Sequence, residues 1–341
     1  MYLSYREIDG YNAMINQILT TRGYGKTYGW QDKVLKHVER NKGRKFMYLV
    51  RRKVDIDILT EQEINPFKNY MIDNYTKYFN EDGTEKLIIN KKGFFFDNER
   101  VGYIFPISEA NKIKRGSGFA DVDYIIWDEF LIDRESKEKY LPNEPKLFMS
   151  LVDTVVRNRK GVKVYMLGNA LVFYNPYNIY WNIDKPYKKE AKLFQNGKIL
   201  VYVKAPKEFI EYRKHTDVGE LMQGTDYEQM ALYNRFQGES NGFIRKKDKG
   251  ARFMCTLYLE GQKIGIWVGD YCFYVSPNYN LAVDERYCFD IFSQQQGVRL
   301  LTKSIRNTPV ETVINAYKIG LVFFENQKVK DIFMRVLTKF I

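Results

Sequence analysis

Short apolar runs alternate with amphipathic segments through the first half of the chain. The runs Ala13–Leu19, Phe46–Val50, Tyr124–Trp127 and Val162–Leu167 each have the length of a short strand and predict buried β-strands. Between the first two, Thr27–Arg40 places apolar residues at helical spacing. Strands that alternate with helices are typical of a mostly parallel sheet. We therefore expect an α/β fold here.

The second half of the chain has a different pattern. Lys204–Phe236 is polar and predicts helices, and Gly238–Gly250, which is rich in glycine, serine and charge, predicts a linker. Strand patterns separated by turns follow, and they end in helical stretches. We therefore expect a first domain at 1–197, a helical linker or lid at 198–250 and a small α/β domain at 251–341.

Composition narrows the class of protein. Of the 341 residues, 45% are apolar and 28% are charged, which is enough to build packed cores. The N-terminus is polar and no apolar run approaches the roughly 18 residues of a membrane span, so we expect neither a signal peptide nor a membrane partner. Three cysteines without C-x-x-C spacing suit a reducing compartment. With two histidines, the chain has few candidate ligands for a zinc cluster and few candidate bases for a serine–histidine–aspartate triad.

The net charge of +12 gives information on the kind of molecule that the protein binds. A basic surface of this size favours a polyanion such as nucleic acid. Lysine, asparagine, isoleucine, tyrosine and phenylalanine are all abundant, however, and all have codons rich in A and T. A genomic bias can therefore account for part of the lysine excess, and charge alone leaves both explanations open.

The first expected strand is joined to the first expected helix by a glycine-rich loop, Arg22-Gly23-Tyr24-Gly25-Lys26-Thr27. Glycines let backbone N–H groups turn toward phosphates, and the helix N-terminus adds its positive dipole end. We expect Lys26 to reach the β- and γ-phosphates of ATP and the Thr27 hydroxyl to bind Mg²⁺. Thr20 stands where the usual loop has its first glycine, and a glycine-rich turn with an exposed lysine is the alternative.

Acidic and amide side chains follow two other expected strands. Asp128 and Glu129 come directly after one strand, and Asn169 follows the next. At such strand ends Asp128 can hold Mg²⁺, Glu129 can orient the attacking water, and Asn169 can sense the γ-phosphate. Together with the loop, these residues predict a catalytic site that hydrolyses ATP. For Asn169 alone, stabilising its own turn is the alternative.

Basic residues at three places are candidates for contacts with phosphates. Arg157, at the end of an expected helix, is either an arginine finger for a neighbouring subunit or a cation that complements the helix C-terminus. Lys112, Lys114 and Arg115 precede the acidic strand, where they can contact DNA, a neighbour's nucleotide or solvent alone. A third cluster lies in the second half of the chain and consists of Arg245, Lys246 and Lys247. We expect this cluster to bind DNA phosphates.

These motifs resemble those of a known family. The loop Arg22–Thr27, the strand ending in Asp128 and Glu129, and Leu167–Ala170 followed by Asn175–Tyr177 are similar to the DNA-packaging ATPases of phi29-like tailed phages, relatives of terminase large subunits. The resemblance implies an ASCE-type P-loop ATPase that pumps double-stranded DNA into a procapsid. It implies a homo-oligomeric ring, expected to be a pentamer, that binds the portal (connector). It also allows a structural RNA as a further partner.

The resemblance also implies roles for single residues. Lys26 and Thr27 would bind phosphate and Mg²⁺, and Glu129 would be the catalytic carboxylate. Arg157 would act in trans as the finger, and Arg115 lies where the family has a second basic residue acting on a neighbour's nucleotide. The protein would work in the host cytoplasm, attached transiently to the procapsid, and would be absent from the mature virion.

The C-terminal domain resembles the RNase-H-like nuclease domain of terminases in a degenerate form. A two-metal nuclease needs converging carboxylates, whereas the expected strand Phe253–Leu259 contains none and Asp270, Asp284 and Asp290 are dispersed. We therefore expect no nuclease activity. The alternatives are another P-loop motor such as a helicase, a DNA-binding scaffold with a relic nucleotide site, and a terminase with an active nuclease.

Overall fold

The computed structural model divides the chain into two compact units. The first comprises Met1–Val172 and Pro186–Gln237, and the second comprises Phe173–Lys185 and Gly238–Ile341. The structure describes residues 3–61, 64–112, 118–133, 136–169, 171–185, 190–233, 243–302, 304–337 and 340. This division differs from the expected one, because the first unit continues past residue 197 into the segment expected to be a separate lid. The residues after 238, expected in the linker, cluster with the second unit.

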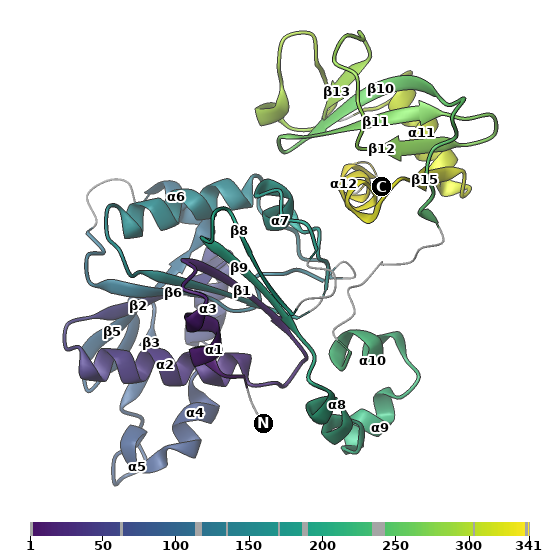
Figure 1. Ribbon diagram of the computed structural model, residues 1–341. Coiled ribbons are helices and arrows are strands. Elements are labelled where there is room, and N and C mark those ends of the chain that lie inside the picture. Colours follow the sequence, from purple (N-terminus) through teal and green to yellow (C-terminus); the bar gives the residue numbers. More distant parts are fainter. Residues whose placement is uncertain are drawn as a thin grey trace. The chain divides into compact units, whose positions relative to one another are not determined.

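The described part of the first unit contains a nine-stranded sheet in the order β3-β4-β5-β2-β6-β7-β1-β9-β8 (Figure 1). Its strands are β1 (Ile15–Thr20), β2 (Lys45–Val50), β3 (Leu87–Asn90), β4 (Gly93–Phe96), β5 (Glu99–Pro106), β6 (Val122–Trp127), β7 (Lys163–Gly168), β8 (Ala191–Phe194) and β9 (Ile199–Lys204). The strands from β5 across to β9 run parallel, and β3, β4 and β8 add antiparallel edges. The expected α/β fold with a mostly parallel sheet is confirmed.

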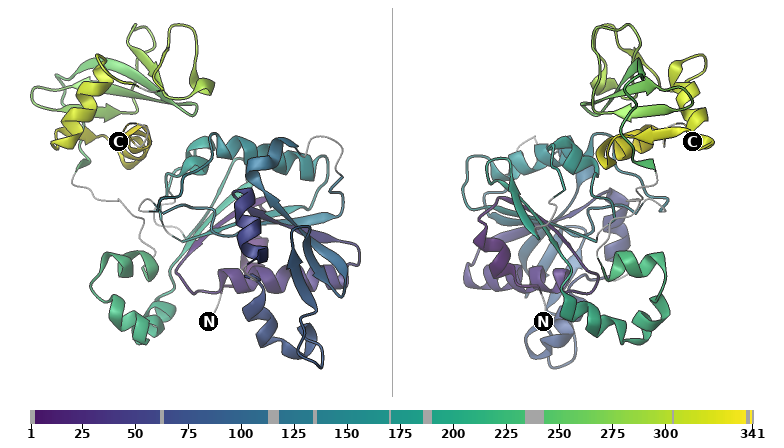
Figure 2. Two further views of the ribbon diagram at one scale, coloured as in Figure 1. Left: turned by 180° about the vertical axis from the view of Figure 1, so that it is seen from behind. Right: turned by 45° about the vertical axis from the view of Figure 1, so that its right-hand side comes forward.

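Helices cover both faces of this sheet. The described helices of this unit are α1 (Tyr5–Gly10), α2 (Lys26–Arg40), α3 (Lys53–Glu61), α4 (Lys68–Asp73), α5 (Tyr75–Tyr78), the 3-10 helix η1 (Ile107–Lys112), α6 (Glu144–Val156), α8 (Lys207–Lys214), α9 (Asp217–Met222) and α10 (Asp226–Ala231). Figure 1 and Figure 2 show α2 and α6 on opposite faces. Side chains alternate along each strand, so Tyr165 and Leu167 join the core under α2, whereas the Trp127 ring lies 5.4 Å from that of Phe148 in α6.

The strand order brings the sequence motifs together. β7 lies between β1 and β6, so the residues that follow these three strands, Thr21, Asn169 and Asp128, lie at one edge of the sheet. In open α/β sheets, ligands bind at this carboxyl edge.

The second unit is a small α/β domain, as expected. Its described strands form a six-stranded mixed sheet in the order β14-β13-β10-β11-β12-β15. They are β10 (Arg252–Leu259), β11 (Gln262–Val268), β12 (Phe273–Ser276), β13 (Arg286–Cys288), β14 (Arg299–Leu300) and β15 (Val322–Phe324). Its helices are α7 (Pro176–Tyr180), the 3-10 helix η3 (Ile291–Ser293), α11 (Pro309–Lys318) and α12 (Gln327–Leu337). In the described parts of both units, no helix has the length and apolar character that crossing a membrane requires.

Candidate nucleotide-binding site

The glycine-rich loop leaves β1 at Thr20 and enters α2 at Lys26. Gly23 (φ +82°) and Gly25 (φ +84°) adopt backbone conformations that strain any residue with a Cβ atom, so the turn depends on glycine at both positions. Gly25 also caps the first turn of α2. The unpaired N–H groups and the dipole of a helix N-terminus provide the surroundings that a phosphate prefers.

Lys26 is the buried cation of this loop, with 9% of its surface exposed. Its ammonium group donates to the carbonyl oxygens of Thr20 (3.0 Å) and Thr21 (3.4 Å) and to Oδ1 of Asn169 (3.1 Å). Burial lowers the pKa of Lys26 to about 8, although two nearby carboxylates act in the opposite direction. The structure thus places the predicted lysine and the predicted amide in direct contact.

Asp128 lies between α2 and the end of β6. Its Oδ2 atom accepts hydrogen bonds from the Thr27 hydroxyl (2.9 Å) and from Nε1 of Trp30 (3.2 Å). Burial raises the pKa of Asp128, and these two hydrogen bonds offset part of the rise. A hydroxyl and a carboxylate oxygen side by side fit Mg²⁺, which takes few protein oxygens and completes its shell with phosphate and water. In the described residues, no three His, Cys, Asp or Glu side chains are grouped to hold a metal, so an ion here would need nucleotide oxygens.

Glu129 follows Asp128 in a strained turn. It is exposed and has a left-handed backbone (φ +56°), a conformation that costs a residue with a Cβ on the order of 1–3 kcal/mol. Its N–H donates to Oδ1 of Asp128 (3.1 Å), and the N–H of Phe130 donates to the Leu167 carbonyl (3.1 Å). These bonds fix the turn that follows β6 and tie it to the end of β7, so the candidate catalytic carboxylate is held at the edge of the site.

A buried ion pair that no motif indicated supports this turn. Arg51 follows β2 and is 6% exposed; its Nε donates to the buried carboxylate of Glu144 (3.0 Å) and its Nη2 donates to the Phe130 carbonyl (2.7 Å). Arg51 is therefore held in the interior, and it fixes the residue that directly follows Glu129.

A cavity of about 330 Å³ opens at this edge of the sheet, a size that fits a small-molecule ligand. Its lining includes most of the predicted residues, namely Arg22, Gly23, Gly25, Lys26, Thr27, Asp128, Glu129 and Asn169. Four further lining residues, Tyr28, Gln31, Pro66 and Asn69, belong to α2, α4 and the segment before α4. We call these four residues the outer chamber. No motif singled them out, because neutral polar and aromatic side chains in amphipathic segments carry no recognisable spacing.

The helices α8–α10, which we call the lid, pack against the glycine-rich loop. Tyr24 does not line the cavity with the residues named above; its ring is buried 5.3 Å from that of Phe209 in α8. The N–H of Arg22 donates to the Ala231 carbonyl (3.0 Å), and its guanidinium donates to the Tyr227 hydroxyl (2.5 Å). The side chain of Tyr24 therefore supports the loop, and Arg22 connects the loop to the lid.

Arg157 and Arg159 lie toward the amino edge of the sheet, away from the cavity. α6 ends at Val156, and β7 then runs for six residues, roughly 20 Å, before it reaches Asn169. Arg157 is exposed, and its backbone (φ +49°, ψ −124°) is strained for any residue except glycine. The guanidinium of Arg159 instead donates to four backbone carbonyls, those of Phe119, Ala120, Val122 and Val155. Arg159 therefore ties α6 to the start of β6, whereas Arg157 is exposed at the surface.

The basic cluster before β6 is only partly described. Lys112 ends η1, is exposed, and pairs with Glu109 (2.7 Å). Such an exposed pair contributes little to stability and leaves the ammonium accessible to other anions. Lys114 and Arg115 lie outside the described residues.

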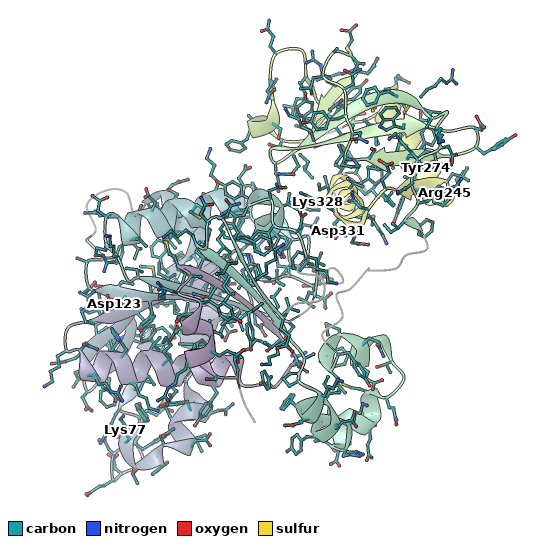
Figure 3. All side chains as sticks on the ribbon, viewed as in Figure 1. Lys77, Asp123, Arg245, Tyr274, Lys328 and Asp331 are labelled. Atoms are coloured by element: carbon teal, nitrogen blue, oxygen red, sulfur yellow. The ribbon has the colours of Figure 1, made fainter. Side chains whose placement is uncertain are left out.

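The basic cluster of the second unit is divided between bound and exposed side chains. Arg245 pairs with Asp248 (3.1 Å) and lies 5.9 Å from the centre of the Tyr274 ring (Figure 3). Lys247 lies 4.8 Å from the centre of the Trp267 ring, whereas Lys246 is exposed. Arg245 is also exposed, so both Arg245 and Lys246 are accessible to an anion.

Of the three dispersed aspartates of the second unit, Asp290 has structural contacts. Asp290 accepts hydrogen bonds from the N–H groups of Glu260 (2.9 Å) and Ser293 (2.9 Å), so it caps η3. Asp270 and Asp284 are exposed. Among the described residues these carboxylates form no group that could hold a metal.

Comparisons with known proteins agree with one another. The chain matches the family described as Podovirus DNA encapsidation protein (Gp16) over residues 1–341. It is 26% identical to a DNA packaging protein of Bacillus phage B103 over 324 residues, which covers 94% of this chain and 96% of that protein. The structure is similar to a chain of the bacteriophage Phi-29 viral genome packaging motor assembly, with a TM-score of 0.72 and 24% identity over 99% of both chains. It is also similar to the N-terminal domain of the DNA packaging ATPase from bacteriophage phi29, with a TM-score of 0.51 and 23% identity over 61% of this chain and 98% of that domain.

Proposed function

Because this chain belongs to the Podovirus DNA encapsidation protein (Gp16) family, it is a phage DNA-packaging protein, and we propose that it drives packaging by hydrolysing ATP. One observation carries the proposal. Lys26, Asp128 and Asn169 meet at one edge of a parallel sheet, around a cavity that also reaches Glu129. These groups supply what phosphoryl transfer needs, namely a cation for the phosphates, a carboxylate for Mg²⁺, an acid for water and an amide at the γ-phosphate.

Each group has a separate task in hydrolysis. The buried Lys26 binds the terminal phosphates where water is scarce and its charge therefore acts strongly. Thr27 and Asp128 hold Mg²⁺, which neutralises charge on the phosphate oxygens. Glu129 orients and polarises the attacking water. Asn169 accepts a hydrogen bond from Lys26 here, and it becomes available to the γ-phosphate when Lys26 turns to the nucleotide.

Arg157 acts in this proposal on the site of another subunit. In its own subunit, the length of β7 separates Arg157 from the cavity. Two different surfaces of one chain that bind each other form a head-to-tail contact, which closes into a ring when the rotation allows. This supports a homo-oligomeric ring, such as a pentamer, in which Arg157 stabilises the charge of the transition state in trans. Arg115 remains a second candidate for that task.

The second unit is proposed to bind nucleic acid without cutting it. β10 contains no acidic residue, and Asp290 is used to cap η3. Lys246, with Arg245 and Lys247 beside it, offers cations for the DNA backbone, as does Lys112 in the first unit. The proposed partners are double-stranded DNA, the portal of the procapsid and a structural RNA where the assembly has one. The proposed location is the host cytoplasm during capsid filling.

The test is ATP-dependent protection of DNA from an added nuclease by purified procapsids together with this chain. We expect protection with the wild-type chain and none with Glu129→Gln, which retains nucleotide binding but lacks the carboxylate. Protection that does not depend on ATP would contradict the motor and favour a DNA-binding scaffold. Strand separation on a forked DNA substrate would favour a helicase, and metal-dependent cutting of plasmid DNA would favour an active nuclease.

A further inference from the structure

The lid forms a group of helices beyond the end of β9 (Figure 1). It contacts three consecutive residues of the glycine-rich loop. Arg22 and Tyr24 contact it through the hydrogen bonds and the ring pair described above. Gly23, which lies between them in the chain, faces Phe209 and Arg213 of α8. The lid is therefore in direct contact with the loop that is expected to bind phosphates.

Arg213 approaches this loop where a side chain is absent. A β carbon at position 23 would lie 3.7 Å from Cζ of Phe209 and 4.0 Å from Cζ and Nε of Arg213. Phe209 and Arg213 are four residues apart on α8, so they share the helix face that packs on the loop. Gly23 also lines the nucleotide cavity. Because glycine has no side chain, the Arg213 guanidinium packs close to the backbone of a residue that lines the cavity.

The guanidinium of Arg213 has a donor that the folded chain does not use. Its Nε atom is buried and has no hydrogen-bond partner among the described residues. A buried donor on a charged group is costly when it is unpaired, so such a group in a native protein requires an explanation. Two neighbouring cations differ in this respect. Arg22 donates to the Tyr227 hydroxyl, and Lys214 pairs with Glu211.

The charge around the loop indicates which acceptor suits Arg213. Arg22, Lys26 and Arg213 place three cations at a loop whose helix N-terminus already favours an anion. These cations repel one another when no anion is bound. A phosphate offers several oxygens, and a planar guanidinium can donate to two of them at once. A phosphate oxygen of a bound nucleotide is therefore the acceptor that fits.

We propose that Arg213 binds a phosphate oxygen of the nucleotide held by its own chain and thereby fixes the lid against the glycine-rich loop. The proposal rests on nucleotide binding at the site described above and adds a residue from the lid to that site. With nucleotide bound, Arg213 joins the lid to the ligand. Without nucleotide, the lid keeps its contacts with Arg22, Gly23 and Tyr24 but lacks this one. The order of the lid should therefore depend on whether the site is occupied.

Ligand competition tests the contact with phosphate. Arg213→Met removes the charge and keeps an unbranched side chain that can pack on Gly23 and Phe209. Displacement of a fluorescent ATP analogue from the isolated chain measures its affinity for ATP and for inorganic tripolyphosphate. We expect Arg213→Met to weaken both affinities about 10- to 100-fold, as loss of a charge-assisted hydrogen bond predicts. Lys214→Met, the matched control one residue further along α8, should bind both ligands as the wild type does.

Hydrogen exchange tests the effect on the lid. In the wild type, Mg²⁺ with a non-hydrolysable ATP analogue should slow exchange of the backbone amides of α8–α10 as well as those of α2. In Arg213→Met at saturating analogue, the slowing should remain in α2 and be lost in α8–α10. A lid that the analogue protects equally in both chains would overturn the proposal.

Urea unfolding without nucleotide separates phosphate binding from a purely structural role. Because Nε of Arg213 has no partner in the described residues, Arg213→Met should unfold at no lower urea concentration than the wild type. Unfolding at lower urea together with unchanged ATP affinity would overturn the inference and make Arg213 a packing residue. A loss of affinity for ATP but not for tripolyphosphate would also overturn it, because the contact would then be to the nucleoside. An assembled wild-type chain that binds ATP but releases no phosphate would contradict the proposed function itself, whichever result Arg213→Met gives.

Discussion

Lys26 binds phosphate in the proposed mechanism, but its charge is buried. We therefore predict that this charge destabilises the protein when no nucleotide is bound. Lys26 has a pKa of about 8 in place of the ordinary 10.5. Each tenfold change in a protonation equilibrium is worth about 1.4 kcal/mol, so keeping this lysine charged at neutral pH costs about 3 kcal/mol. Lys26→Met removes the charge and keeps an apolar chain of similar length. It also removes the donor to Thr20, Thr21 and Asn169, a loss of about 1 kcal/mol. The nucleotide-free variant should therefore be about 2 kcal/mol more stable than the wild type near pH 7.

The stability difference between Lys26→Met and the wild type should also depend on pH. Between pH 8 and 10.5 the unfolded chain binds more protons at Lys26 than the folded chain does, so this residue makes wild-type stability rise with pH. The variant lacks this contribution, and its advantage should fall steadily across that window. Below pH 8 the lysine is protonated in both states, and the advantage should be constant.

Urea unfolding at about pH 7 and about pH 10 measures both effects. Trp30 and Trp127 are buried in the first unit, so their fluorescence reports its unfolding in the wild type and in Lys26→Met. With added Mg²⁺ and ATP the wild type should become more stable than Lys26→Met, because a ligand stabilises only the chain that binds it. A variant less stable than the wild type near pH 7, or an advantage independent of pH, would refute the reasoning.

Four further predictions concern single side chains. Glu129→Gln should lower phosphate release at least about 100-fold while nucleotide fluorescence shows unchanged ATP binding; equal turnover would exclude Glu129 as the catalytic acid. Arg157→Gly should raise stability toward urea by about 1–3 kcal/mol, because glycine accepts that backbone, yet lower assembled ATPase about 10³-fold; activity should partly return on mixing with Glu129→Gln chains, and full activity of Arg157→Gly alone would contradict a finger. Arg159→Ala should lose about 2–3 kcal/mol in the same urea assay, since it leaves carbonyls without their donor; unchanged stability would contradict a structural role. Lys246→Ala should weaken DNA binding and lower the slope of log affinity against log salt by about 0.9, and an unchanged slope would show that it contacts no phosphate.

The parts of the fold and the site that could be predicted are those set by local pattern. The apolar strands and the amphipathic α2 follow from spacing along the chain, and side chains at the ends of parallel strands must meet at one edge. The sequence therefore predicts that Lys26, Asp128 and Asn169 lie together.

The parts that could not be predicted depend on distant pairs or on backbone conformation. β9 belongs to the first sheet because it pairs with β1, as Ile199 does with Ile15, and no local pattern reveals such pairing. Arg51 and Glu144 are separated by 93 residues, so their ion pair was invisible in the sequence. The sequence does not distinguish Arg157 from Arg159. Only their contacts and the positive φ of Arg157 do so.

The placement of Arg157 and the cavity at opposite edges of one sheet has a consequence for timing. In a ring assembled as proposed, Arg157 of every chain acts on the nucleotide site of one neighbour. The site of the same chain receives Arg157 from the neighbour on its other side. All copies share one handedness, so rotation around the ring preserves this order throughout. The two directions around the ring are then structurally different, so successive hydrolysis events can follow one direction in preference to the other. This difference is built into the subunit interface before any DNA enters the ring.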